Sequence, residues 1–235
     1  MVSAMMPDFL MPLAPAALTD VRLTPQRRRV LMEVVSEHRH RVVLQANGLR
    51  PRSTLFFHGP PGCGKTLTAR ALATELGLPA FVVRFDALLG AYLGQTSLRL
   101  RETFQFAASR QCVLVLDEID AVGRIRGKAT DIGELDRVVI SLMQQLDLVR
   151  PAGLIIAASN VPDELDLALR RRFELSIEFP APSPSALMEY SKKLARSKRI
   201  PIVNGVSQKL ASAKTFAAAE QILSDEHRRR ILRGV

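Results

Sequence analysis

The 235-residue sequence contains no tryptophan, only two tyrosines and two cysteines, and 5% aromatic residues. Cys63 and Cys112 are too few for a disulfide framework or a structural zinc site, which favours a reducing compartment. No apolar run approaches the roughly 20 residues of a membrane span. The apolar segment Met1–Leu18 has no early Lys or Arg and is broken by three prolines, which argues against a signal peptide. We therefore expect a cytoplasmic protein with no membrane partner.

The composition favours one folded domain with an uneven distribution of charge. Hydrophobic residues make up 47% of the chain, enough for a sizeable core, and this argues against intrinsic disorder. The formal net charge is +10, divided as +4 over residues 1–58, −1 over residues 59–180 and +7 over residues 181–235. The basic flanks favour contact with something anionic or simply keep the chain soluble, and charge alone does not choose between these.

Short apolar runs alternate with longer stretches in which apolar residues recur at helical spacing. The predicted strands are Ser53–Phe57, Phe81–Phe85, Cys112–Leu116, Leu154–Ala158 and Leu175–Phe179. The predicted helices between them are Thr66–Leu76, Leu98–Ser109 and Leu135–Leu148. This alternation predicts an α/β fold with a five-stranded parallel sheet flanked by helices. Three prolines after Phe179 mark a boundary, and a helical region is predicted beyond it.

A glycine-rich motif of the form G-x-x-x-x-G-K-T lies between the first predicted strand and the first predicted helix of this series. Its glycines allow backbone N–H groups to surround phosphates, its lysine reaches the terminal phosphates, and its threonine ligates Mg²⁺. The motif predicts a P-loop nucleotide site. The candidate nucleotide-binding residues are Gly59, Pro60, Pro61, Gly62, Cys63, Gly64, Lys65, Thr66 and Leu67.

Cys63 inside this loop has two interpretations. A helix N-terminus lowers the pKa of a thiol, which would suit a redox sensor. The alternative is a small side chain tolerated at a variable position, and we prefer this interpretation.

Asp117 and Glu118 follow four apolar residues of the predicted strand that begins at Cys112. This places both carboxylates at the carboxyl end of a strand, where open α/β sheets bind ligands. Asp117 is expected to hold Mg²⁺ together with Thr66, and Glu118 to orient and deprotonate an attacking water. Taken alone, the pair could equally cap the next helix. The P-loop motif about fifty residues upstream favours the catalytic interpretation.

Over roughly residues 45–225 the chain resembles an AAA+ ATPase of the AAA clade, which includes katanin-type severing enzymes, endosomal-sorting disassembly ATPases and membrane-anchored proteases. The resemblance rests on the P-loop motif, Asp117-Glu118-Ile119-Asp120, Ala157-Ala158-Ser159-Asn160 and Arg170-Arg171-Arg172-Phe173. It implies an N-terminal helical arm or linker over residues 1–44, an AAA+ P-loop nucleotide-binding core over 45–180, and a small, shortened helical lid over 181–235. A stand-alone minimal module is the implied organisation.

The resemblance also implies roles for individual residues. Asn160 would position the lytic water, and Arg171 and Arg172 would enter the active site of a neighbouring subunit, so the implied catalytic set is Lys65, Asp117, Glu118, Asn160, Arg171 and Arg172. Adjacent guanidinium groups repel one another unless an anion lies between them, which agrees with this role. The alternative is a solvated run of charge.

Two further segments match positions of the clade. Tyr92, Leu93 and Gly94 fall where the clade carries its pore loop, so Tyr92 would grip an extended polypeptide, and the alternative is a tyrosine packed on the core. Ala218, in the small-residue turn Thr215–Glu220, would approach the adenine. Asp147 resembles the start of the segment that senses a neighbour's nucleotide.

These observations predict a Mg²⁺-dependent ATPase that forms an ATP-dependent homo-oligomeric ring and remodels or threads proteins. The resemblance implies a hexamer. A separate adaptor or protease would select or receive the substrate. The alternative is a nucleic-acid-acting AAA+ ATPase, such as a loader or mobile-element regulator, that uses the basic flanks. The low aromatic content offers no base-stacking surface, so this alternative ranks second.

Overall fold

The computed structural model of the chain describes residues 6–85, 88, 95–122, 132–202 and 204–233. By their contacts these residues form two compact units. The first unit holds the chain up to His58 together with Lys65–Glu178, and the second holds Gly59–Gly64 together with the chain from Phe179 onward.

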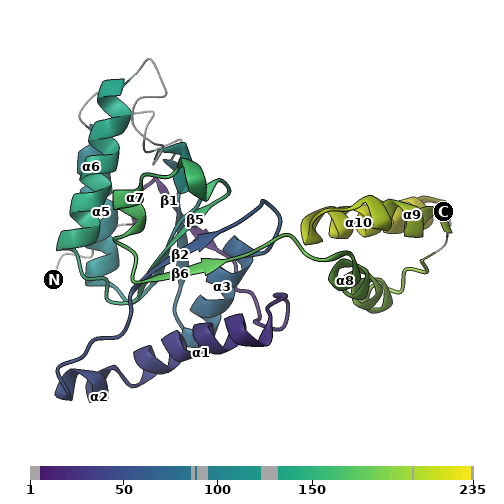
Figure 1. Ribbon diagram of the computed structural model, residues 1–235, viewed down its shortest axis with the longest axis horizontal. Helices are drawn as coiled ribbons and strands as arrows, with labels where there is room; N and C mark the ends of the chain where they lie inside the picture. The colour runs from purple at the N-terminus through teal and green to yellow at the C-terminus, as the bar shows by residue number, and fades with distance from the viewer. Residues whose placement is uncertain (1–5, 86–87, 89–94, 123–131, 203, 234–235) are drawn as a thin grey trace. The chain divides into compact units, whose positions relative to one another are not determined.

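The first unit is built around a six-stranded sheet with helices on both sides (Figure 1). The spatial order is β1-β3-β4-β5-β2-β6, and every neighbouring pair is parallel except β1 with β3. The strands are β1 (Leu10–Leu13), β2 (Thr54–His58), β3 (Ala80–Val83), β4 (Val113–Leu116), β5 (Leu154–Ser159) and β6 (Leu175–Glu178). The predicted α/β fold is confirmed, and the five predicted strands are present with ends shifted by at most two residues.

The strand β1 corrects the sequence prediction in two ways. It is a sixth, antiparallel strand of a sheet predicted to have five, and it lies within the arm that the sequence predicts to be helical. Leu10 pairs with Val83 and Pro12 with Phe81 at one edge of the sheet. Proline has no N–H to donate to a ladder, so strands that contain it are found at edges. The side chains alternate, because Leu10 is 3% exposed and Met11 is 48% exposed. Pro12 is therefore compatible with this edge strand.

The helices of the first unit cover both faces of the sheet (Figure 1). On one side lie α5 (Gln95–Ser109), α6 (Ile132–Leu148) and the short α7 (Leu167–Arg170), and on the other lie α1 (Pro25–Arg39) and α3 (Lys65–Leu76), with α2 (Arg41–Ala46) following α1. Phe104 of α5 and Leu142 of α6 pack with Leu114 of β4 in the main hydrophobic cluster. Apolar residues at helical spacing thus meet strands that are buried on both faces.

The second unit contains the helices α8 (Pro184–Ser197), α9 (Asn204–Ser212) and α10 (Phe216–Arg233). Ser183 caps α8 by accepting a hydrogen bond from the Ala186 N–H at 3.2 Å, and Pro184 occupies the first helical position. The three helices share one hydrophobic cluster, to which they contribute Leu187, Leu210 and Leu223 respectively. The region after Phe179 is thus helical, as predicted. None of the helices described in either unit combines the length and hydropathy needed to cross a bilayer.

Candidate functional site

Lys65 and Asn160 come together at the edge where the parallel strands end. Lys65 is the first residue of α3, the helix that follows β2 in the chain, and Asn160 directly follows β5. The Lys65 Nζ donates a hydrogen bond to Asn160 Oδ1 at 2.8 Å, and the lysine residue is only 6% exposed. A buried ammonium group needs polar partners. The contact therefore holds the lysine head group at the carboxyl edge of the sheet, where both residues are predicted to act.

Thr66 and Asp117 form the second contact of this edge. The Thr66 hydroxyl donates to Asp117 Oδ2 at 2.7 Å, which joins the start of α3 to the end of β4. Hydroxyl and carboxylate oxygens are hard ligands that suit Mg²⁺, which usually takes only one or two protein ligands besides water and phosphate oxygens. This donor pair fits the predicted ion. Within the described residues, no group of three or more His, Cys, Asp or Glu side chains forms a metal site of another kind.

Glu118 has a left-handed backbone, with φ 52° and ψ 41°. This conformation costs a non-glycine residue roughly 1–3 kcal/mol and is found most often at functional sites. Its N–H donates to Asp117 Oδ1 at 3.1 Å, and its side chain is exposed. Two residues later, Asp120 Oδ1 accepts from the Asn160 N–H at 3.1 Å and so fixes the position of Asn160. The exposed Glu118 carboxylate is accessible to a water molecule.

The glycine-rich loop Gly59–Gly64 lies in the second unit with the residues after Phe179. Gly59 has φ 134°, and a Cβ at this position would lie 2.1 Å from the Phe179 carbonyl oxygen. Gly62, with φ 72°, accepts a hydrogen bond from the Ala217 N–H at 3.3 Å. A Cβ on Gly62 would lie 2.9 Å from Thr215 Oγ1. Both positions therefore require glycine.

The small-residue turn predicted to approach the adenine meets this loop. Thr215 Oγ1 accepts from the Ala218 N–H at 3.2 Å, and the preceding Ala217 is bonded to Gly62. Cys63 in the loop is buried, with its Sγ 3.8 Å from the Pro61 carbonyl oxygen. The structure thus brings together the predicted loop and the turn that contains Ala218.

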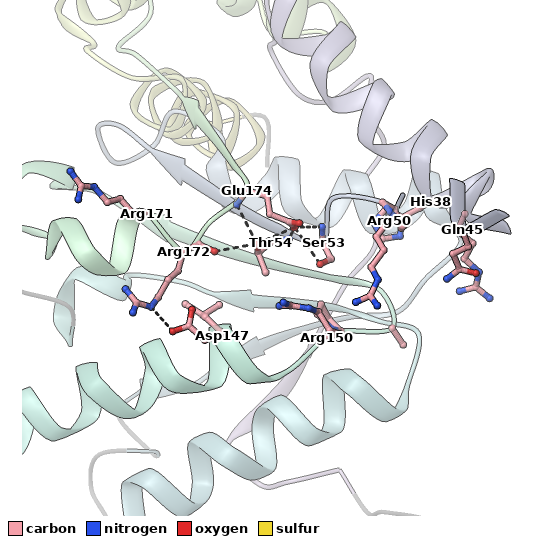
Figure 2. Close-up of a pocket in the computed structure, with 15 residues that line it drawn as sticks. His38, Gln45, Arg50, Ser53, Thr54, Asp147, Arg150, Arg171, Arg172 and Glu174 are labelled. Atoms are coloured by element: carbon pink, nitrogen blue, oxygen red, sulfur yellow. Dashed lines mark hydrogen bonds and ion pairs between the residues drawn. The ribbon is translucent and has the colours of Figure 1, made fainter. Parts of the chain in front are cut away.

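The three consecutive arginines before β6 have different environments. Arg170 donates to the Pro162 carbonyl at 3.4 Å and lies over the Phe56 ring. Arg172 donates to Asp147 Oδ2 at 3.0 Å (Figure 2). It also donates to the Ala168 carbonyl at 2.6 Å. Arg171 is exposed and makes no ion pair with a described residue. Dispersal onto separate partners relieves the repulsion expected between adjacent guanidinium groups, and it leaves Arg171 available to an external anion.

Comparison with known proteins identifies the family. Residues 55–181 match the family described as "ATPase family associated with various cellular activities (AAA)". The chain belongs to this family. The predictions of an AAA ATPase and of its α/β P-loop fold are therefore confirmed, and ATP hydrolysis is the reaction of the family.

Curated relatives align with different shares of this chain. An uncharacterized AAA family ATPase, y4kL of Sinorhizobium fredii, is 39% identical over 86% of this chain and 60% of its own length. A putative 26S proteasome regulatory subunit homolog of Methanocaldococcus jannaschii is 36% identical over 72% of this chain and 46% of its own length. The peroxisomal ATPase PEX6 of Arthrobotrys oligospora is 40% identical over 61% of this chain and 13% of its own length. The chain thus spans 60% or less of the length of these relatives.

A solved AAA structure shows the same fold. The crystal structure of the FIGL-1 AAA domain in complex with ADP matches with a TM-score of 0.71 and 23% sequence identity, covering 92% of this chain and 74% of that chain. At this identity the match establishes the AAA fold alone.

The predicted AAA pore-loop residues Tyr92, Leu93 and Gly94 lie outside the described residues. Their role stays a prediction.

His58 is a residue at this AAA site that the sequence analysis did not select. It ends β2 directly before Gly59 and stacks on Phe56 with ring centroids 5.3 Å apart. Partial burial lowers its pKa, and the positive charges of Arg170 and Lys65 lower it further. These effects outweigh the nearby carboxylates of Glu178 and Asp163, which raise the pKa, so the neutral imidazole is favoured. Its position immediately before the loop was the one available sequence signal, because its burial and its charged neighbours depend on the fold.

Proposed function

We propose that this AAA ATPase is a ring-forming motor that remodels or threads protein substrates. The observation that supports its catalytic part is the pair of contacts at the carboxyl edge, Lys65 with Asn160 and Thr66 with Asp117. They join the lysine and threonine of the P-loop motif to the ends of two other strands. This is the arrangement needed to hold a nucleoside triphosphate beside a water-activating residue.

In this proposal the residues have separate roles. Backbone N–H groups of Gly59–Gly64 and the ammonium of Lys65 bind phosphate oxygens, with Leu67 and Ala218 next to the nucleotide. Thr66 and Asp117 would hold Mg²⁺, which when bound would supply positive charge next to the phosphate oxygens. Glu118 takes a proton from the water that attacks the γ-phosphorus while the bond to the β–γ bridging oxygen breaks, and Asn160 orients that water.

The ring is proposed because Arg171 has no anionic partner of its own among the described residues. An arginine supplied to the site of a neighbouring copy stabilises charge in the transition state of phosphoryl transfer. Hydrolysis would then require assembly, for which the family resemblance suggests a hexamer. A polypeptide is the proposed substrate, gripped by Tyr92, and a separate adaptor or protease would complete the system.

The test is the ATPase rate of the purified chain with an unfolded protein or with DNA added, at low and high salt. We expect the unfolded protein to raise the rate and Tyr92→Ala to abolish that increase. Glu118→Gln serves as the hydrolysis-deficient control, and Tyr190→Ala serves as a tyrosine control in the second unit. Stimulation by DNA that disappears at high salt and is indifferent to Tyr92→Ala would instead establish the nucleic-acid alternative.

A further inference from the structure

A groove of about 730 Å³ lies within the first unit (Figure 2), and neither Lys65 nor Asp117 lines it. Ser53 and Thr54 at the start of β2, Ala152 before β5 and Glu174 before β6 line it. These residues mark the amino-terminal ends of three parallel strands. The groove is therefore separate from the site at the carboxyl ends.

Positive charge exceeds negative charge in this groove. Its lining includes two carboxylates and five arginines: Arg41, Arg50, Arg150, Arg171 and Arg172. Both carboxylates have internal partners. Asp147 pairs with Arg172, and Glu174 Oε2 accepts the N–H groups of Ser53 at 2.6 Å and Thr54 at 3.0 Å.

Of the five arginines of the groove, only Arg172 has an acidic partner among the described residues, and Arg41 lies against the neutral amide of Gln111. Arg50, Arg150 and Arg171 are exposed, and none of them makes an ion pair with another described residue. Figure 2 shows them spread along the groove, with Arg171 at the far end from Arg50. Guanidinium groups held in one concave site favour a bound anion, because their forked donors match carboxylate and phosphate oxygens.

The chain's own phosphate site does not supply this anion to Arg50 and Arg150. Arg50 precedes β2 and Arg150 precedes β5, whereas Lys65, Asp117 and Asn160 follow the carboxyl ends of β2, β4 and β5. The five residues of β2 alone span roughly 15 Å, so an arginine at one edge does not reach the other. The anion must come from another molecule.

A second copy of this chain carries suitable anions. Its carboxyl edge presents the exposed acids Glu118 and Asp163 beside the proposed ATP phosphates. A basic patch on one edge and an acidic patch on the other are complementary in a head-to-tail contact, the kind that closes into rings. Nucleic acid fits less well, because the groove is compact and its lining contains no Phe, Tyr or Trp to stack a base.

We propose that the groove receives the ATP-bearing edge of a second copy, and that Arg50 and Arg150 bind anionic groups of that copy in addition to the contact made by Arg171 at the other end of the groove. Arg172 positions this surface through Asp147 rather than contacting the neighbour. The inference rests on the proposed function. It adds Arg50 and Arg150 to the surface through which Arg171 of one subunit would act on the ATP site of its neighbour.

The test mixes two variants that are each inactive alone. One carries Lys65→Ala and cannot use ATP but keeps the groove. The other carries Arg171→Ala and keeps its ATP site. If arginines act between copies, the mixture regains ATPase activity. Arg50→Gln and Arg150→Gln are then added to one partner at a time, and Arg28→Gln, an exposed arginine of α1 outside the groove, is the matched control.

We expect the two groove substitutions to lower the regained rate about tenfold when they are on the Lys65→Ala partner, the effect of losing charge-assisted hydrogen bonds. On the Arg171→Ala partner they should have a much smaller effect, and Arg28→Gln should have none on either. A mixture that stays inactive would overturn the proposed ring together with this inference. A second outcome is that the mixture regains activity that the groove substitutions do not lower, or that they lower equally on either partner. Either result would overturn the inference and leave the proposed ring standing. The groove would be assigned to nucleic acid if the chain binds DNA in a salt-sensitive way, if the Arg50→Gln/Arg150→Gln variant loses this binding, and if these substitutions leave the ATPase rate of the mixture unchanged.

Discussion

Arg52 and Glu37 show how single residues attach α1 to the start of β2. The Arg52 N–H donates to Glu37 Oε2 at 2.9 Å, and its Nε donates to Glu37 Oε1 at 2.9 Å. Burial raises the pKa of Glu37, but the hydrogen bonds and charge of Arg52 outweigh burial, so the pKa lies below its usual 4.5. The carboxylate form is therefore favoured in the folded chain.

Glu37→Gln is expected to lower the free energy of unfolding by about 1–2 kcal/mol at pH 7. A lowered pKa in the folded state gives stability that is present above the unfolded value and is lost as pH falls through the folded one. The difference between wild type and variant in urea unfolding should thus shrink below about pH 4.5. The control is Glu33→Gln, whose half-exposed carboxylate lies 3.9 Å from Arg52 and should change stability by about 0.5 kcal/mol or less. Equal losses in both variants would contradict this account.

At the scale of elements, β1 tests whether the sixth strand contributes to the core. Leu10 is 3% exposed and belongs to the main hydrophobic cluster, whereas its neighbour Met11 is 48% exposed. Leu10→Ala should cost about 2–4 kcal/mol because it removes a buried side chain and leaves a cavity. Met11→Ala should stay within about 0.5 kcal/mol. Urea unfolding of the two variants measures both values, and a Leu10→Ala variant as stable as Met11→Ala would show that β1 is not packed on the sheet.

Element positions were largely predictable because they depend on local pattern. The strands β4 and β5 are runs of buried apolar residues, and α6 repeats apolar residues at helical spacing. Those signals lie within a few residues of one another in the chain. The strand β1 was missed because its pairing depends on the free edge of β3, about 70 residues later, and because its prolines favour irregular structure.

For the whole molecule, the main hydrophobic cluster of the sheet and the cluster of the helices α8–α10 lie in different units, so we expect the two units to have separate stabilities. Leu223 is fully buried in the helical cluster of the second unit, and Leu114 is fully buried in the cluster of the sheet. Leu223→Ala should speed amide hydrogen exchange throughout α8–α10 and leave β4 and β5 protected, whereas Leu114→Ala should do the reverse. Leu232→Ala is the control, because this residue is 76% exposed. Equal acceleration in both units by either variant would show that they unfold as one.

The candidate site was predictable where a short motif defines its chemistry. The spacing from Gly59 to Thr66, and the acids Asp117 and Glu118 after an apolar strand, indicate phosphate binding without a structure. The distinction between Arg171 and Arg172 was not predictable in this way. It depends on Asp147, 25 residues earlier in the chain, which pairs with Arg172 and leaves Arg171 exposed.

The sequence by itself determined the fold class and the order of the five parallel strands along the chain, and it predicts the residues of a phosphate loop, because each depends on spacing within one short segment. Only the tertiary structure decided the sixth strand, the separate partners of the arginines and the basic groove. The bond from Glu174 to the Ser53 N–H spans 121 positions, and Arg50 and Arg150 line the same groove although 100 residues separate them. Such pairings form when the chain closes on itself, and no local pattern in the sequence encodes them.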